Sequence, residues 1–144
     1  MFFGSYNHQI DQKGRIRVPF KFKEELGEGY VITRGVNGCL FIMSSATKER
    51  YSAQFSNIAL TDPEGLKAAR WFMAYMFEAE EDNQGRILLP QSARKVCGIE
   101  KNIVFVGAGD RIEIWSEEVW NKYLGEDTAD NFDEAFMALQ RYGV

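Results

Sequence analysis

The 144-residue sequence has little of the chemistry that builds metal sites and disulfide frameworks. It contains one histidine, His8, and two cysteines, Cys39 and Cys97, which are far apart and embedded in apolar sequence. One His and two distant Cys cannot supply the four ligands of a zinc site within one chain, so no metal is expected. The two cysteines could form one disulfide, but in a reducing cytosol we expect a buried thiol at each position.

Long apolar runs are also missing. No stretch approaches the roughly 20 apolar residues that a membrane span requires. The first four residues, Met-Phe-Phe-Gly, lack a basic start, a long apolar run and a small-residue cleavage site, so no signal peptide is evident. We therefore expect a cytoplasmic protein without a membrane partner. No segment is rich enough in Gly, Ser or Pro to separate independent domains, which favours one compact body.

A catalytic constellation is the third absence. A lone His carries no triad signature, and His8 has no nucleophile pattern around it. Residues 106–110 follow a predicted strand, but Ile112 stands where a dinucleotide-binding loop has its third glycine. An acidic run could suggest a cation site, although a solvated strand edge that repels other chains is favoured; it comprises Glu78, Glu80, Glu81 and Asp82. The sequence predicts no enzyme, no cofactor and no small-molecule substrate.

Positive charge is scarce overall but unevenly distributed. The net charge is −4, yet residues 1–60 carry eight Lys/Arg against five Asp/Glu, and the remaining residues carry nine against sixteen. Five basic residues fall between positions 13 and 23, namely Lys13, Arg15, Arg17, Lys21 and Lys23. A local basic face can neutralise phosphates even when the whole chain is acidic. The charge pattern therefore permits a nucleic-acid partner without requiring one.

The main positive feature is an internal repeat. Residues 11–19 and 82–90 both read Asp-x-x-Gly-Arg-Ile-x-Φ-Pro, where Φ is aliphatic. After one extra residue in the second copy the apolar pattern still matches, with 31–35 over 103–107 and 40–44 over 112–116. Such self-similarity predicts a tandem duplication. We divide the chain into a first repeat at 1–60, a linking helix at 61–76 and a second repeat with a C-terminal helix at 77–144.

Each copy is predicted to contain two hairpins and a short helix between them. Asp11 and Gly14 suit the first and last positions of a type I turn, and a proline ends the strand that follows. In the first copy we expect strands at 6–10, 15–18, 30–34 and 40–43, and helices at 19–26 and from Ser44 or Ser45 toward Phe55. In the second we expect hairpin bends at 82–86 and 107–110, and helices at 90–96 and from Ser116. Asp62-Pro63-Glu64 favours the start of the linking helix, and 132–139 predicts an amphipathic helix.

The Asp-x-x-Gly-Arg loops carry the strongest functional signal. A two-stranded ribbon fits the major groove of DNA, and an arginine just past its tip can bind guanine through two hydrogen bonds. Turn geometry alone explains Asp and Gly but does not require Arg15 and Arg86. The second loop has Gln84 and Leu88 where the first has Lys13 and Arg17, so the first should contribute more electrostatic affinity if both loops bind. The second loop then depends on Arg86 alone or serves mainly in packing.

The paired Asp-x-x-x-Arg motifs, the Met-Phe-x-Gly start and the length resemble the bacterial MraZ family. The resemblance implies a mixed α/β, β-rich fold: a double swapped-hairpin β-barrel of two tandem ββαββ-type repeats with peripheral helices, like two joined AbrB/SpoVT motifs. It also implies a closed ring, often an octamer, that represses its own division and cell-wall gene cluster at repeated promoter boxes. Together with the loop chemistry, it gives the candidate DNA-binding residues Asp11, Lys13, Gly14, Arg15, Arg17, Asp82, Gly85 and Arg86.

Two functions remain open on the sequence. The first is a sequence-specific repressor associated with the nucleoid, whose oligomer raises the effective concentration of each further loop at successive boxes. The alternative is an antitoxin-like module that binds another protein, which the overall acidity and the weaker second loop favour. Four aromatic residues near the linking helix suit either a core or a subunit interface, namely Trp71, Phe72, Tyr75 and Phe77.

Overall fold

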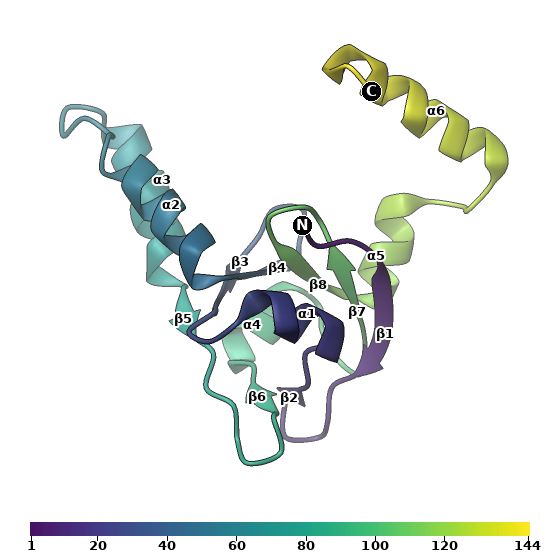
Figure 1. Cartoon of the computed structure of the whole chain (residues 1–144), viewed down its shortest axis with the longest axis horizontal. Helices are drawn as coiled ribbons and strands as arrows, with labels where there is room; N and C mark the ends of the chain where they lie inside the picture. Colours follow the sequence, from purple (N-terminus) through teal and green to yellow (C-terminus); the bar gives the residue numbers. More distant parts are fainter.

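Strands and helices alternate along the computed structural model, which describes residues 1–144 (Figure 1). The strands are β1 (Ser5–Gln9), β2 (Arg15–Ile16), β3 (Val31–Arg34), β4 (Leu40–Met43), β5 (Phe77–Glu78), β6 (Ile87–Leu88), β7 (Asn102–Gly107) and β8 (Ile112–Ser116). The helices are α1 (Phe20–Leu26), α2 (Ser45–Phe55), α3 (Pro63–Ala74), α4 (Gln91–Val96), α5 (Glu117–Leu124), α6 (Ala129–Leu139) and the 3-10 helix η1 (Gln140–Tyr142). The predicted mixed α/β class is confirmed.

The strands of the two copies are interleaved in one antiparallel sheet. Its order is β1-β7-β8-β4-β3-β5, while β2 and β6 pair in a separate two-stranded ladder. The order reads the same when the copies are exchanged, and Phe41 and Glu113, which occupy equivalent positions, face each other at its centre. Ile16 and Ile87 do so in the ladder. No closed barrel is found, because the sheet ends at β1 and β5 and the ladder bonds to neither edge.

The first hairpin predicted in each copy does not form as a paired ribbon. β1 pairs with β7 and β2 with β6, although the Asp11 amide still donates to the Arg15 carbonyl at 3.0 Å across the loop. This exchange places Ile16 and Ile87 side by side on the inner face of the ladder, where both are buried. The second hairpins are confirmed as the β3–β4 and β7–β8 pairs.

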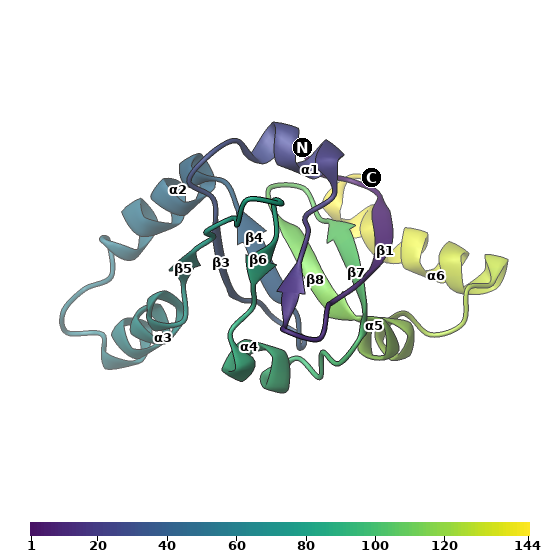
Figure 2. The same cartoon turned by 90° about the horizontal axis from the view of Figure 1, so that it is seen from below.

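The core lies between the β2–β6 ladder and the six-stranded sheet. Figure 2 shows the ladder in front of the sheet, with α1 and α4 at its two ends. The ladder contributes Ile16, Val18, Ile87 and Leu89, and the sheet contributes residues such as Ile42 and Phe105. Burial of one such aliphatic side chain stabilises the fold by about 1.5–3 kcal/mol. The alternation of buried and exposed residues fixes which ladder side chains face solvent.

The helix starts follow the local signals in the sequence. Pro19 and Pro90 directly precede α1 and α4. Asp62, Ser44 and Ser116 cap α3, α2 and α5, with side-chain oxygens that accept backbone N–H groups at 3.0, 3.2 and 3.4 Å. These caps satisfy amides that the first helical turn leaves without a partner. No helix is both long and apolar enough to cross a bilayer.

The N-terminal segment is held against the β7–β8 turn by backbone contacts. Phe2 and Gly109 exchange two hydrogen bonds of 2.7 and 3.0 Å, and the Phe2 side chain is buried. A Cβ atom on Gly107 would lie 2.3 Å from the Phe3 amide nitrogen. Only glycine allows the two backbones to approach this closely.

Two helical extensions leave the central body on opposite sides. α2 and α3 lie beside each other at one end, and α6 projects from the other, in both views (Figures 1 and 2). Every residue from Asn121 to Val144 is exposed. The sequence predicts one compact body, whereas α6 projects from the central body with its apolar side chains exposed. α6 also begins three residues before the predicted start.

Both cysteines are buried free thiols, as predicted. The Cys39 thiol donates to the Val36 carbonyl at 3.2 Å. Burial raises the pKa of Cys39 to about 12 and also raises the pKa of Cys97. Because the thiolate is the reactive form, neither sulfur is activated at neutral pH.

Candidate nucleic-acid interface

In the first loop one carboxylate closes the turn and also fixes the arginine. Asp11 Oδ1 accepts the Lys13 and Arg15 backbone N–H groups at 3.0 and 2.9 Å, while Oδ2 accepts Arg15 Nε at 2.7 Å. The Gly14 amide donates to the Asp11 carbonyl at 3.0 Å. Gly14 has φ of +83°, which glycine adopts without strain. The guanidinium of Arg15 is therefore held by the same residue that shapes the loop.

The second loop repeats this geometry. Asp82 Oδ1 accepts the Gln84 and Arg86 amides, each at 2.9 Å, and Oδ2 accepts Arg86 Nε at 3.0 Å. Gly85 has φ of +75°. In both loops the same aspartate therefore closes the turn and holds the arginine side chain.

Both aspartates stay ionised well below neutral pH. The backbone N–H of Arg15 and the guanidinium of the same residue hold the pKa of Asp11 below its ordinary value of 3.8. The backbone N–H of Arg86 has the same effect on the pKa of Asp82. Hydrogen bonds to a carboxylate favour its charged form, so each aspartate remains an acceptor for its arginine under cellular conditions.

The outward side of the ladder collects the arginines of both copies. We call the side chains of Arg15, Arg17, Arg86 and Leu88 the ladder face, since Ile16, Val18, Ile87 and Leu89 alternate with them on the buried side. Arg17 and Leu88 are exposed, whereas Arg15 and Arg86 are partly buried. Arg15 lies opposite Leu88 in the register, and its Nη1 is 4.0 Å from Asp82 Oδ2 in the other loop. The fold therefore brings the two loops together, with Lys13 exposed at the tip of the first.

Two basic side chains that sequence analysis did not assign to the site approach the loops from α1 and α4. Arg94 Nε donates to the Leu89 carbonyl at 3.1 Å, and a Cβ on Gly14 would lie 2.7 Å from Arg94 Cζ. Lys23 Nζ lies 3.7 Å from the corresponding point on Gly85. The two side chains occupy equivalent positions in the copies, and each faces the loop of the other copy. The only sign of this pair in the sequence was that Lys23 and Arg94 stand at the same distance after the Asp-x-x-Gly-Arg motif of their own copy.

Glu81 anchors the second loop to the first copy. Its Oε1 accepts the Tyr30 hydroxyl at 2.7 Å and its Oε2 accepts Lys23 Nζ at 2.8 Å. Burial alone would raise the pKa of Glu81, but the hydrogen bonds from Lys23 and Tyr30 outweigh it and lower that pKa. Burial and the Glu81 carboxylate raise the pKa of Tyr30. Glu81 thus forms a specific ion pair, whereas the sequence suggested only a solvated strand edge.

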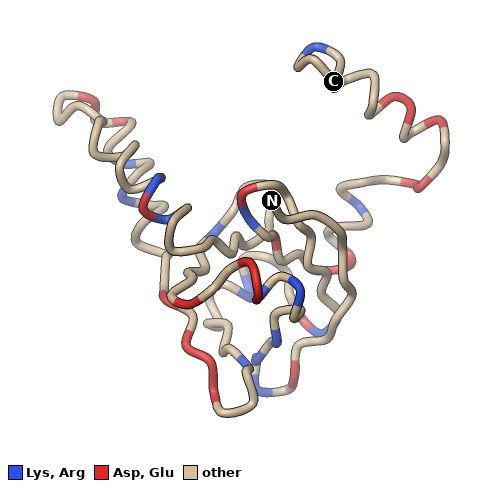
Figure 3. The backbone as a smooth tube through the Cα atoms, in the orientation of Figure 1, with Lys and Arg blue, Asp and Glu red and all other residues tan.

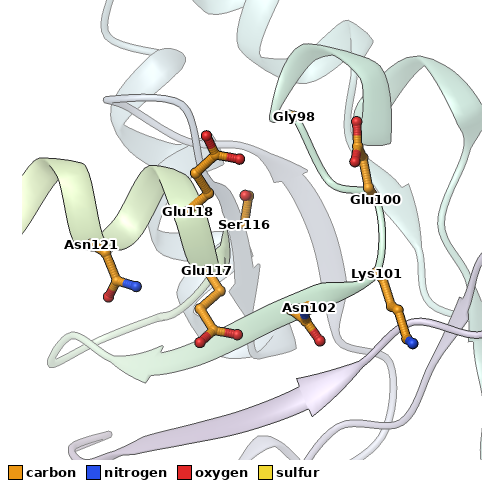
Figure 4. Close-up of a pocket in the computed structure, with 8 residues that line it drawn as sticks. All are labelled: Gly98, Glu100, Lys101, Asn102, Ser116, Glu117, Glu118 and Asn121. Carbon is orange, nitrogen blue, oxygen red and sulfur yellow. The ribbon is translucent and has the colours of Figure 1, made fainter.

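A separate polar cavity of about 380 Å³ lies between β7 and α5 (Figure 4). Its rim carries Lys101 and three carboxylates from Glu100, Glu117 and Glu118. Figure 4 shows these side chains spread around the cavity on different elements. No group of three or more His, Cys, Asp or Glu side chains is placed to hold a metal ion.

The fold and the loops define a mixed α/β protein whose two halves supply matching, aspartate-braced arginines to one shared ladder. This chain belongs to the MraZ family. The family model described as an antitoxin-like MraZ protein matches it twice, over residues 1–69 and 72–141.

Relatives of similar length carry the same family name. The chain is 40% identical to the transcriptional regulator MraZ of Caldanaerobacter subterraneus subsp. tengcongensis over all of both chains. It is 42% identical to that of Lachnoclostridium phytofermentans over 100% of this chain and 99% of the relative. It is also 42% identical to that of a Thermoanaerobacter species, over 93% of each chain.

Proposed function

We propose that this chain is a sequence-specific DNA-binding transcriptional regulator, and that the ladder face is its contact surface for double-stranded DNA. The observation that carries the proposal is the pair of braced arginines, Arg15 and Arg86, on the outward side of one ladder, where 25% and 27% of their side chains are exposed. Each Nε is held by an aspartate, and the terminal nitrogens make no hydrogen bond within the chain, although Arg15 Nη1 lies 4.0 Å from Asp82 Oδ2. A guanidinium with two available nitrogens matches guanine O6 and N7 in the major groove.

Fixing the arginines in advance supports affinity as well as orientation. A long arginine side chain that is ordered only on binding loses conformational freedom at that step. The hydrogen bonds from Arg15 to Asp11 and from Arg86 to Asp82 already order both side chains in the free protein, so less conformational freedom is lost on binding DNA. The ladder is two strands wide, which is the width of a β-ribbon that the major groove accepts.

The first loop contributes more charge to the ladder face than the second. Lys13 and Arg17 are exposed and available to phosphates, whereas the second copy has Gln84 and Leu88 at these positions. Phosphate contacts position a protein on DNA, and base contacts specify the sequence. The first loop therefore supplies most of the salt-sensitive affinity, and Arg86 supplies base contact in the second.

The relatives are named transcriptional regulators, which supports a regulatory role, and we infer the particular role as follows. The chain acts in the cytoplasm, at the nucleoid, as a repressor of its own division and cell-wall gene cluster. It binds repeated promoter boxes as a closed ring, for which eight copies is the expected number. The exchange of strands between the copies is compatible with a double swapped-hairpin arrangement, and several loops on one ring compensate for the few contacts that each makes.

A second candidate function is supported by Leu88. This side chain is 58% exposed in the middle of the ladder face, where an apolar residue suits contact with a protein better than contact with phosphates. The description of the family as antitoxin-like points in the same direction. In this case the loops would hold a protein partner.

The deciding experiment is binding to labelled DNA from upstream of the chain's own gene at low and moderate salt. Arg15→Ala should weaken specific binding by about 5-fold to 150-fold, which corresponds to the 1–3 kcal/mol of a bidentate base contact. Arg86→Ala tests the second loop. Arg50→Ala, on α2 and away from the ladder, is the matched control and should bind as the wild type does. If wild-type protein prefers this DNA no more than random sequence, the regulator proposal fails and a protein partner is sought.

A further inference from the structure

One apolar side chain lies exposed in the middle of the otherwise charged ladder face. Leu88 is 58% exposed, whereas its neighbours along the chain, Ile87 and Leu89, are buried. Strand alternation points Leu88 away from the core, and it belongs to neither of the two apolar clusters of the protein. Packing within the chain therefore gives no reason for a leucine at this position.

The equivalent position in the first copy holds Arg17. Arginine suits a surface that meets phosphates, and leucine offers neither charge nor a hydrogen bond. A ladder that contacted only phosphates would bind more tightly with arginine at both positions. The difference between the copies indicates that Leu88 meets a group of another kind.

The register places Leu88 directly opposite Arg15. Side chains that face each other across an antiparallel pair have Cβ atoms about 4.5–5.5 Å apart. Successive bases of one DNA strand are about 3.4 Å apart along the helix axis. The groups that Leu88 and Arg15 reach in a duplex therefore lie within about two base pairs of each other.

The outer side of the ladder is open to a duplex. Figure 2 looks onto this side, and neither α1 nor α4 lies in front of β2 and β6. Asp11 holds Nε of Arg15 at 2.7 Å, so the arginine and the leucine opposite it face outward from a fixed frame. A base edge that meets Arg15 thus also comes close to Leu88.

The major groove offers an apolar side chain one suitable group. Base edges there present hydrogen-bond donors and acceptors, and the C5 methyl group of thymine is the exception. Leucine placed against a donor or an acceptor would leave that group without a partner, which is unfavourable. Placed against the methyl group, it removes apolar surface of both molecules from water.

We propose that Leu88 is a specificity-determining residue that contacts the C5 methyl group of a thymine, close to the base that Arg15 contacts. The inference rests on the proposed DNA binding and adds a base that the second copy selects. It gives the ladder face two kinds of base contact, a guanidinium for hydrogen-bond acceptors and an apolar side chain for a methyl group.

The test measures binding of the full-length protein to the labelled duplex from upstream of its own gene, in which each thymine in turn is replaced by uracil. Uracil pairs with adenine as thymine does and lacks only the methyl group. At one position in a bound site this replacement should weaken wild-type binding by about 4-fold, which corresponds to about 0.8 kcal/mol for one methyl group.

Variants of Leu88 show whether this side chain senses the methyl group. Leu88→Ala should bind the thymine duplex and the sensitive uracil duplex equally well. Leu88→Met keeps a long apolar side chain and should retain the preference for thymine. Leu124→Ala is the matched control, because Leu124 is 59% exposed on α5, away from the ladder, and its loss should leave the wild-type preference unchanged.

Far-ultraviolet circular dichroism shows whether each variant is folded. A preference for thymine that persists in a folded Leu88→Ala variant would overturn the inference, as would equal binding of every uracil duplex by wild type. In both cases wild type would still bind its upstream DNA specifically, so the proposed function would stand. If wild type bound this DNA no better than random sequence, both would fail, and a protein partner would be sought for Leu88.

Discussion

Asp11 and Asp82 each accept three hydrogen bonds, two from backbone amides and one from an arginine side chain. One oxygen shapes the turn and the other orients the guanidinium. Replacement by asparagine separates these two roles, because the amide keeps one accepting oxygen but puts an NH₂ group where the other oxygen accepts Nε. Loop shape should survive such a change better than the orientation of the arginine.

The lowered pKa of Asp11 gives a pH-dependent prediction. A carboxyl whose pKa is lower in the folded state stabilises the fold above its unfolded pKa of about 3.9, and this stabilisation is lost as pH falls through the folded value. Asp11→Asn should therefore be less stable than wild type at pH 7, with a difference that shrinks below pH 4. Urea unfolding at pH 7, 4 and 3 measures it.

Asp127→Asn is the control for this series. Asp127 lies in the exposed segment between α5 and α6 and accepts no side-chain hydrogen bond from the rest of the chain, so its replacement should not change the pH profile. A constant difference between Asp11→Asn and wild type across all three pH values would show that the Asp11 carboxylate charge does not stabilise the loop.

At the scale of elements, local signals in the sequence were sufficient for the helices and the second hairpins. Proline and serine positions predicted where α1, α4 and α5 begin, because caps act within a few residues. The partners of β1 and β2 could not be predicted in this way. Local sequence does not select the partner of the five-residue β1 or of the two-residue β2, and for β2 the choice depends on which pairing buries Ile16 and Ile87 together.

In the candidate site, too, contacts between residues close in the sequence could be predicted, whereas contacts between distant residues could not. Asp11, Gly14 and Arg15 form a local loop, so their spacing predicted their geometry. Arg94 reaches Gly14 only because the two copies exchange strands, and the Glu81 contact with Tyr30 likewise joins residues distant in the chain. The sequence suggested a hairpin turn at residues 107–110, but it gave no sign that the N-terminus packs against Gly107.

That close packing leads to a stability prediction. In Gly107→Ala the new methyl group would overlap the backbone at Phe3, and the N-terminal segment must move away. Since the buried Phe2 side chain leaves with it, the free energy of unfolding should fall by about 3 kcal/mol. Chemical unfolding at pH 7 measures the change.

Two further variants locate the cause. Phe2→Ala should cost a similar amount, and the double variant should cost less than the sum of the two, because both remove the same contact. Phe3→Ala removes a neighbouring aromatic ring that is 74% exposed and should change stability by less than about 0.5 kcal/mol. Full additivity in the double variant would separate Gly107 from the seating of Phe2.

At the scale of the whole molecule, most of the negative charge lies away from the ladder face that we propose as the DNA-binding surface. The chain is acidic overall, with much of the negative charge in the second half, including α6, while the ladder face and the first loop are basic (Figure 3). Long-range attraction to DNA is therefore weak, and binding depends on contacts made close to the phosphates. The salt dependence of DNA binding should therefore be the sum of contributions from a few single phosphate contacts.

The salt dependence can be predicted for single residues. Each phosphate contact changes the slope of log K against log salt by about 0.9 for duplex DNA. Lys13→Ala and Arg17→Ala should each reduce that slope by about 1 and weaken binding to all sequences alike. Lys122→Ala removes an exposed lysine from α5, away from the ladder, and should leave the slope unchanged. Equal slopes for all three variants would place the phosphates elsewhere on the protein.

The interleaved strand order has a consequence for synthesis of the protein. β1, β2 and β4 of the first half pair with β7, β6 and β8, which leave the ribosome later. At about 5–20 residues per second, roughly 4–15 s pass between the emergence of β4 and that of β8. During this interval the first half exposes unpaired strand edges and the apolar residues of a core that does not yet exist. The nascent chain therefore depends on prompt completion of translation, and a ribosome that stalls in the second half would leave an aggregation-prone fragment.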